Sequence, residues 1–163
     1  SIFVLILTQR EKEKIADNLR NRGFASDDFF VDSVAPSEIP AYLAAADTAI
    51  SFIKACYSKL SSSPTKIAEY LAAGLPIIAN PGVGDVDDLI ESRRVGAIIE
   101  DFTKESYLKV LSELKSISDV RSRSRETATA EFDLEKSGGA RYRLLYNRIL
   151  GEDDLEKAKE TTR

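Results

Sequence analysis

The feature that most constrains the fold is a regular alternation of short apolar runs with amphipathic segments over the first 116 residues. The apolar runs have the length of strands and span residues 2–7, 29–34, 50–53, 75–79 and 96–100. The segments between them are predicted helices and span residues 11–22, 38–46, 64–73, 86–94 and 104–115. Strands that alternate with helices in this way form βαβ units with parallel strands. We therefore predict an α/β fold, with one doubly wound parallel sheet of five or six strands and helices on both faces.

The last part of the chain carries no strand pattern. Residues 121–135 and 139–150 are predicted to form two C-terminal helices, separated at Gly138 and Gly139. Residues 151–163 alternate in charge and have almost no apolar side chains, which is typical of a frayed, solvated tail. Because 163 residues suffice for one good core but not for two ordinary domains, we predict a single domain over residues 1–150.

The composition argues against several classes of protein. A formal net charge of −4 is unlike that of a general nucleic-acid-binding protein. The chain has no histidine and one cysteine, Cys56, so we expect no metal site and no internal disulfide. No apolar run reaches the length of a membrane span, and the start lacks the pattern of a signal peptide. We expect a cytoplasmic protein, with the inner membrane surface as the alternative location.

One loop between a strand and a helix holds the most informative residues, because ligands of parallel sheets bind at the carboxyl ends of the strands. Ser63 is the predicted N-cap of the helix, and Pro64 is its predicted first residue. The free amides of this first turn and the helix dipole favour an anion, and Lys66 adds a positive charge nearby. Glu69 lies about one turn deeper, where a carboxylate can accept two hydrogen bonds from a ribose diol. The spacing therefore suits a nucleoside diphosphate.

Three stretches of the chain resemble one known family. The run Ser-Pro-Thr-Lys-x-x-Glu-Tyr-Leu-Ala-Ala-Gly-Leu-Pro at residues 63–76 is similar to the donor-site signature of retaining, group 1 glycosyltransferases with the GT-B fold. Residues 34–47 resemble the helix before that family's third strand, and residues 79–85 resemble its glycine turn. The likeness covers most of residues 1–115. It implies the Rossmann-like, donor-binding C-terminal half of a GT-B fold.

The resemblance assigns a role to Glu69. This residue matches the second glutamate of the family's Glu-x7-Glu motif, which holds the ribose of the donor nucleotide. The first glutamate, which contacts the transferred sugar, would fall at position 61, where this chain has Ser61. The family's diphosphate-binding Arg and Lys have no match here and would lie upstream of the first strand.

The resemblance also assigns roles to smaller side chains at two strand ends. Ser62, Ser63 and Thr65 match the loop and helix start that approach the sugar and the diphosphate in this family. Ser61 and Lys66 are expected to belong to the same binding site. Ser33 and Val34 match the strand end beside the nucleobase, which they would contact through backbone groups.

The function implied is transfer of a sugar, of the hexosyltransferase type, from a nucleoside diphosphate sugar to an acceptor, with retention of configuration. The resemblance implies no cofactor and no obligatory metal. The sequence identifies no catalytic residue, and it leaves the nucleotide, the sugar and the acceptor undetermined. The chain has no methionine and begins inside a strand-like run, so we expect a fragment that lacks the N-terminal acceptor domain. Such a fragment alone should be inactive.

Two other functions stay open. A receiver-like interaction module would need an acidic pair after its first strand and an aspartate after its third, where this chain has Gln9-Arg10 and Lys54. A GT-B-like sugar-nucleotide epimerase shares the fold, but it usually relies on carboxylates and histidines near the sugar.

Two charged or glycine-rich features have simpler interpretations. Gly82-x-Gly84 lacks the third glycine of a dinucleotide fingerprint and is typical of a turn, with Asp85 and Asp88 as capping residues. The three arginines of residues 121–125 are interpreted as one solvated cluster, with a contact to an acidic membrane surface as the alternative: Arg121, Arg123 and Arg125.

Overall fold

A computed structural model describes residues 2–150 of the chain. The chain divides into two compact units, Ser1–Thr48 and Ala49–Arg163. The tail expected over residues 151–163 lies outside the described residues.

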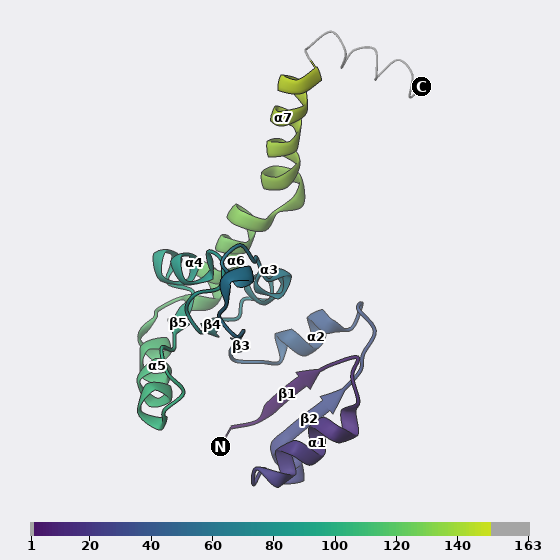
Figure 1. Cartoon of the computed structure of the whole chain (residues 1–163), viewed down its shortest axis with the longest axis vertical. Coiled ribbons are helices and arrows are strands. Elements are labelled where there is room, and N and C mark those ends of the chain that lie inside the picture. Colours follow the sequence, from purple (N-terminus) through teal and green to yellow (C-terminus); the bar gives the residue numbers. More distant parts are fainter. Residues whose placement is uncertain (1, 151–163) are drawn as a thin grey trace. The chain divides into compact units, whose positions relative to one another are not determined.

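The first unit is a single βαβ unit followed by a short helix (Figure 1). Strand β1 (Val4–Leu7) runs parallel to β2 (Phe29–Asp32), in a register that pairs Val4 with Phe29. Helix α1 (Lys12–Asn21) connects the two strands, and α2 (Ile39–Ala44) follows β2. All the hydrophobic residues buried in the described part of the chain lie from Ala49 onward, so this unit contributes none of them.

The second unit is built on a parallel sheet in the order β3-β4-β5 (Ala49–Ser51, Ile77–Ala79 and Gly96–Ile98). The central strand β4 is buried on both faces, because successive side chains of a strand point to opposite sides. Ile77 and Ala79 join one core cluster, and Ile78 joins another.

Helices cover both faces of this sheet (Figure 1). Helices α3 (Thr65–Ala72), α4 (Val86–Arg93) and α6 (Val120–Phe132) contribute buried side chains to the cluster that contains Ile77. Helix α5 (Lys104–Ser116) contributes Val110 to the cluster that contains Ile78. The second unit therefore has helices on both sides of its parallel strands, as a doubly wound fold requires.

The last helix continues away from this sheet. A π-helical turn (Leu134–Gly139) separates α6 from α7 (Ala140–Leu150), at the two glycines where the sequence predicted a break. All residues from Arg141 to Leu150 are exposed, and Figure 1 shows α7 extending beyond the other helices of its unit.

The α/β fold class predicted from the sequence is confirmed. All five predicted strands are present, and within each unit they pair in parallel: β1 with β2 in the first unit, and β3, β4 and β5 in that order in the second. The observed elements also begin and end within a few residues of the predicted bounds.

The arginines of α6 do not form one solvated cluster, so that prediction is wrong. Arg125 donates to the carbonyl oxygen of Ala73 at 3.3 Å, at the C-terminal end of α3. Arg123 is half-buried, and its Nε has no hydrogen-bond partner among the described residues. Residues two apart on a helix point to nearly opposite sides, which explains why these side chains have different surroundings.

No helix within residues 2–150 is both long enough and apolar enough to cross a membrane.

Candidate functional site

The start of α3 differs from the prediction by one residue. Pro64, and not Ser63, occupies the N-cap position, and no side chain caps the helix. The amide of Ile67 donates to the Pro64 carbonyl oxygen at 3.0 Å, whereas the amides of Thr65 and Lys66 make no hydrogen bond to a described residue. Because Ser63 lies one position too early to cap, this helix end keeps free donors that favour an anion.

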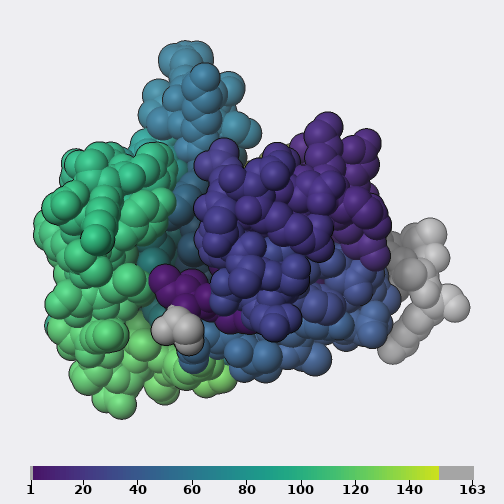
Figure 2. Space-filling view, turned by 90° about the horizontal axis from the view of Figure 1, so that it is seen from below, coloured from purple at the N-terminus to yellow at the C-terminus, as the bar shows by residue number. Residues whose placement is uncertain are grey.

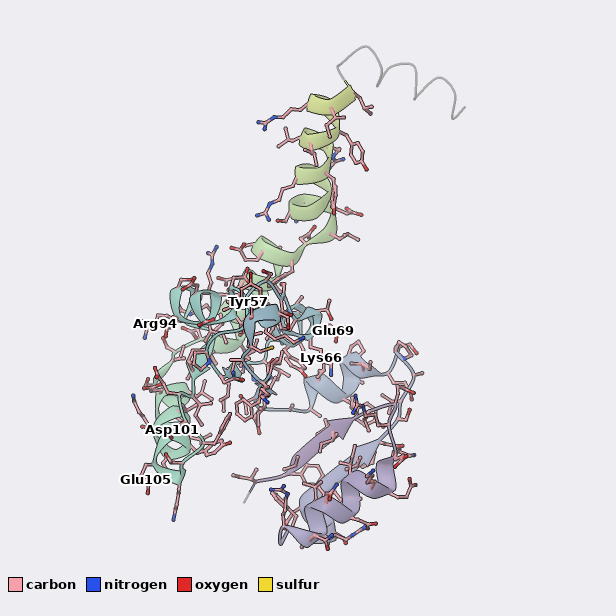
Figure 3. All side chains as sticks on the ribbon, in the orientation of Figure 1. Tyr57, Lys66, Glu69, Arg94, Asp101 and Glu105 are labelled. Carbon is pink, nitrogen blue, oxygen red and sulfur yellow. The ribbon has the colours of Figure 1, made fainter. Side chains whose placement is uncertain are left out.

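Lys66 and Glu69 are exposed and lie on the side of α3 away from its buried face (Figure 3). That face is formed by Ile67, which is 2% exposed, and by Leu71. Neither charged side chain makes an ion pair or hydrogen bond with a described residue. Two unpaired charges of opposite sign are therefore available to a ligand on one side of α3.

Glu69 also lines an open groove of about 520 Å³ between α3 and α6. Its lining residues are Ala68, Glu69, Ala72, Arg125, Ala128, Thr129, Phe132 and Asp133. Burial of the neighbouring Tyr70 side chain raises the pKa of its phenol, and the negative charge of Glu69 raises this pKa further.

The loop before α3 carries the three predicted serines and projects from the second unit. Ser61 and Ser63 are exposed, and Ser62 is half-buried. A short 3-10 helix (Tyr57–Lys59) forms the tip of the loop, where Tyr57 is 92% exposed. Figure 2 shows this loop as a protrusion in the colour of residues near 60.

The loop packs closely onto the glycine turn that follows β4. The amide of Gly84 donates to the Lys59 carbonyl oxygen at 2.9 Å. A Cβ on Gly84 would lie 1.9 Å from the carbonyl oxygen of Ser62, so the two backbones approach where a side chain could not fit. The loops after β3 and β4 thus meet within this unit, at the carboxyl ends of consecutive parallel strands.

Asn80 connects the same two loops, and the sequence did not predict this contact. Its Oδ1 accepts the amide of Ile53 at 2.8 Å, and its Nδ2 donates to the carbonyl oxygens of Ile53 at 2.9 Å and Pro81 at 3.1 Å. An Asn-Pro pair after a strand indicates only a local turn. The contact with Ile53, 27 residues earlier, has no local signature in the sequence.

The capping role predicted for Asp85 and Asp88 is wrong. Asp85 occupies the N-cap position of α4, but its side chain accepts no capping hydrogen bond. Asp87 instead accepts the amide of Gly82 through Oδ2 at 3.2 Å, while its Oδ1 is buried without a partner among the described residues. This hydrogen bond joins the glycine turn to the first turn of α4.

Ser33 and Val34 lie directly after β2, in the first unit, because this strand ends two residues earlier than predicted. The Ser33 amide donates to Asp32 Oδ1 at 2.7 Å, and its hydroxyl donates to Gln9 Oε1 at 3.0 Å. The Lys12 ammonium group also lies 2.7 Å from Asp32 Oδ1. The hydrogen bond from Lys12 lowers the pKa of the Asp32 carboxyl below its ordinary value, and the hydrogen bond from the Ser33 amide lowers this pKa by a smaller amount.

Within the described range, no three His, Cys, Asp or Glu side chains gather in a way that could hold a metal ion. The polar groups near the start of α3 are its free amides, Lys66, Glu69 and the hydroxyls of the preceding loop.

Comparisons with known proteins found similarity among solved structures. No protein-family model matches the chain, and no curated protein sequence does. Among solved structures, the chain is similar to WaaG, a glycosyltransferase involved in lipopolysaccharide biosynthesis, with a TM-score of 0.61 over 80% of this chain. The chain shares the fold of part of a glycosyltransferase.

The similarity to WaaG shows the fold alone, because only 20% of the aligned residues are identical. The match covers 34% of the WaaG chain, so this chain spans about a third of its structural neighbour. Parallel sheets flanked by helices are consistent with the Rossmann-like half of a GT-B fold, which is the fold that the family resemblance implied.

Proposed function

We propose that this chain binds a nucleoside diphosphate sugar as the donor-binding part of a retaining glycosyltransferase. The observation that carries the proposal is the start of α3, where two free backbone amides and the unpaired Lys66 precede the unpaired Glu69. The amides and Lys66 would hold the diphosphate, and the carboxylate of Glu69 would accept hydrogen bonds from the ribose. The glycosyltransferase fold shared with WaaG supports the same interpretation.

The proposed mechanism uses this site to stabilise the leaving group. When the glycosidic bond to the diphosphate breaks, negative charge grows on the phosphate oxygens. Preorganised amides and a cation stabilise such a charge without having to reorganise during the reaction. No metal ion is required for this step. The acceptor would be held by a part of the enzyme that this chain does not provide, so the chain alone binds donor without turnover.

Isothermal calorimetry with UDP-, GDP- and ADP-sugars tests the proposal. The Glu69→Gln substitution should weaken binding of the best donor without changing the melting curve, because Glu69 is exposed and makes no contact that the fold needs. Hydrogen bonds to a charged group contribute about 1.5–3 kcal/mol, and a net loss of about 2 kcal/mol corresponds to about thirty-fold weaker binding.

Lys66→Ala should also weaken binding, and its effect should shrink as salt rises, because salt screens an exposed charge. Helix α5 offers matched controls in Lys104→Ala and Glu105→Gln, since both residues are exposed in the first turn of a helix. Figure 3 shows Glu105 well apart from Glu69. Equal affinities for the Glu69→Gln and Glu105→Gln variants would refute the assignment of the ribose to Glu69.

A further inference from the structure

The hydrogen bonding around Asn80 follows from where the β3–β4 ladder stops. The last paired residues of these strands are Ser51 and Ala79. In this parallel register the amide of Ala49 donates to the carbonyl oxygen of Pro76, one residue before its partner Ile77, so a continued ladder would join Ile53 to the backbone groups of Asn80 and Gly82. The Asn80 carboxamide takes the place of those backbone partners, because it offers Ile53 both an acceptor at 2.8 Å and a donor at 2.9 Å.

This contact fixes the first end of the loop that carries the serines. The loop leaves the sheet directly after Ile53 and runs to Ser63. Its far side is held by Gly84, through the 2.9 Å bond to Lys59 and the close approach of Ser62. Asn80 and Gly84 are only four residues apart, so one short turn after β4 holds both ends of the loop.

The position of the loop determines where the proposed phosphate-binding turn lies. Pro64 alone separates Ser63 from Thr65, the first residue of α3. A shift of the loop would therefore move the serine hydroxyls relative to the free amides of Thr65 and Lys66. Binding sites of this kind need their groups placed to within a fraction of an ångström.

We propose that Asn80 is a positioning residue for donor binding, which acts by holding residues 54–63 on the glycine turn. This inference rests on the function proposed above. Asn80 needs no contact with the donor for this role. Asn80 holds the loop through its hydrogen bonds to Ile53 and Pro81. Its loss should therefore change the position of amides with which Asn80 makes no contact.

The first experiment measures loop position without any ligand. Hydrogen exchange at the amides of Lys59, Ser62 and Gly84 should become faster in Asn80→Ala, although none of these amides bonds to Asn80. Asn80→Asp is nearly the same size and leaves no cavity, but its carboxylate would face the two carbonyl oxygens that Asn80 Nδ2 now serves. It should speed exchange at the same amides.

The second experiment measures affinity for UDP, GDP and ADP by calorimetry, at a temperature where melting curves show every variant folded. Both Asn80 variants should bind the preferred nucleoside diphosphate about ten-fold more weakly than the unmodified chain, a change of about 1.4 kcal/mol. Asn147→Ala is the matched control, because Asn147 is an exposed asparagine of α7, and it should leave affinity unchanged.

The outcomes separate the two proposals. Unchanged exchange at Lys59, Ser62 and Gly84 would overturn the positioning role, whether or not a nucleotide binds. Faster exchange with unchanged affinity would show that Asn80 orders the loop but does not serve the site, and would also overturn it. An unmodified chain that binds none of the three nucleotides would overturn the proposed function itself, and with it the role of Asn80 in donor binding.

Discussion

At Gly84, the lack of a side chain is a geometric requirement of the candidate site. The residue has a φ of +57°, which an L side chain rarely adopts, and the space where its Cβ would lie is filled by the Ser62 carbonyl group. Both effects act on the same contact between the serine loop and the glycine turn. A single methyl group should therefore disturb the site more than the removal of any one serine hydroxyl.

Gly84→Ala should destabilise the chain by about 1–3 kcal/mol, the range for backbone strain, with the steric clash moving the result toward the upper end. Urea unfolding followed by circular dichroism measures this loss. Gly82→Ala is a useful control in the same turn, because Gly82 also has a positive φ of +81° but a Cβ there would meet only the Ala55 side chain, at 3.3 Å. Equal losses for the two variants would mean that the contact with Ser62 adds no constraint beyond strain.

The Lys12–Asp32 pair makes a prediction about titration beside Ser33. The hydrogen bond between the two side chains lowers the pKa of Asp32 and raises that of Lys12. The stabilisation that Asp32 contributes is therefore present above the pKa of Asp32 in the unfolded chain, and it is lost as the pH falls through the lower pKa of Asp32 in the folded chain. The stabilisation that Lys12 contributes is present below the pKa of Lys12 in the unfolded chain, and it is lost as the pH rises through the higher pKa of Lys12 in the folded chain.

In Lys12→Met, the pKa of Asp32 should rise toward its ordinary value, although the Ser33 amide should still hold it somewhat low. Carbon-detected NMR of the carboxyl group follows this titration directly. Lys14→Met serves as the control, because Lys14 lies on the same helix and contacts Glu11 at 3.9 Å in place of Asp32. An Asp32 pKa that is the same in both variants would contradict the assigned cause.

Single-residue predictions from the sequence succeeded where they depended on helical periodicity. The position of Glu69 on the side of α3 away from Ile67 and Leu71 follows from the spacing of these residues along the helix. The cap at Ser63 was wrong because a shift of one residue at a helix end changes which side chain can cap it. Asn80 could not be predicted, since its partner lies 27 residues away.

At the scale of elements, α7 is a regular helix whose residues from Arg141 to Leu150 are all exposed. Tyr142, Leu145, Tyr146, Ile149 and Leu150 share one side of the helix, and all are exposed. The sequence could not predict that this stripe is exposed, because a helix that packs and a helix without a packing partner show the same apolar pattern.

The double variant Leu145→Ser with Ile149→Ser should keep the free energy of unfolding within about 0.5 kcal/mol of the unmodified chain, as expected for exposed positions. Ile67→Ser in α3 should cost more than about 2 kcal/mol, because this side chain is 2% exposed and its loss leaves a cavity. Urea unfolding compares them. A loss in the α7 variant as large as that of Ile67→Ser would show that the stripe is covered in solution.

At the scale of the whole molecule, the sequence predicted the number of strands and their parallel pairing but not the distribution of burial between the two units. An apolar run in the sequence does not specify how deeply its side chains are buried. Both core clusters lie in the second unit, whereas no described residue of the first unit is fully buried.

This division makes a prediction about fragments of the chain. Residues 49–163 contain both described core clusters, so this segment should fold alone and unfold cooperatively in urea, with a midpoint near that of the full chain. Residues 1–48 alone should show no cooperative transition, because a segment of this size without a buried core cannot offset its conformational entropy. A folded first unit with an unfolded second unit would reverse the assignment of the core.

The folded fragment then tests the roles proposed for the residues of the second unit. Thr65, Lys66 and Glu69 all belong to this unit. Residues 49–163 should therefore still bind nucleoside diphosphates, because the groups proposed for the diphosphate and the ribose are present. Calorimetry of the fragment and of the full chain with UDP, GDP and ADP compares the affinities. A fragment that binds none of the three nucleotides, although the full chain binds one of them, would contradict the roles proposed for Thr65, Lys66 and Glu69.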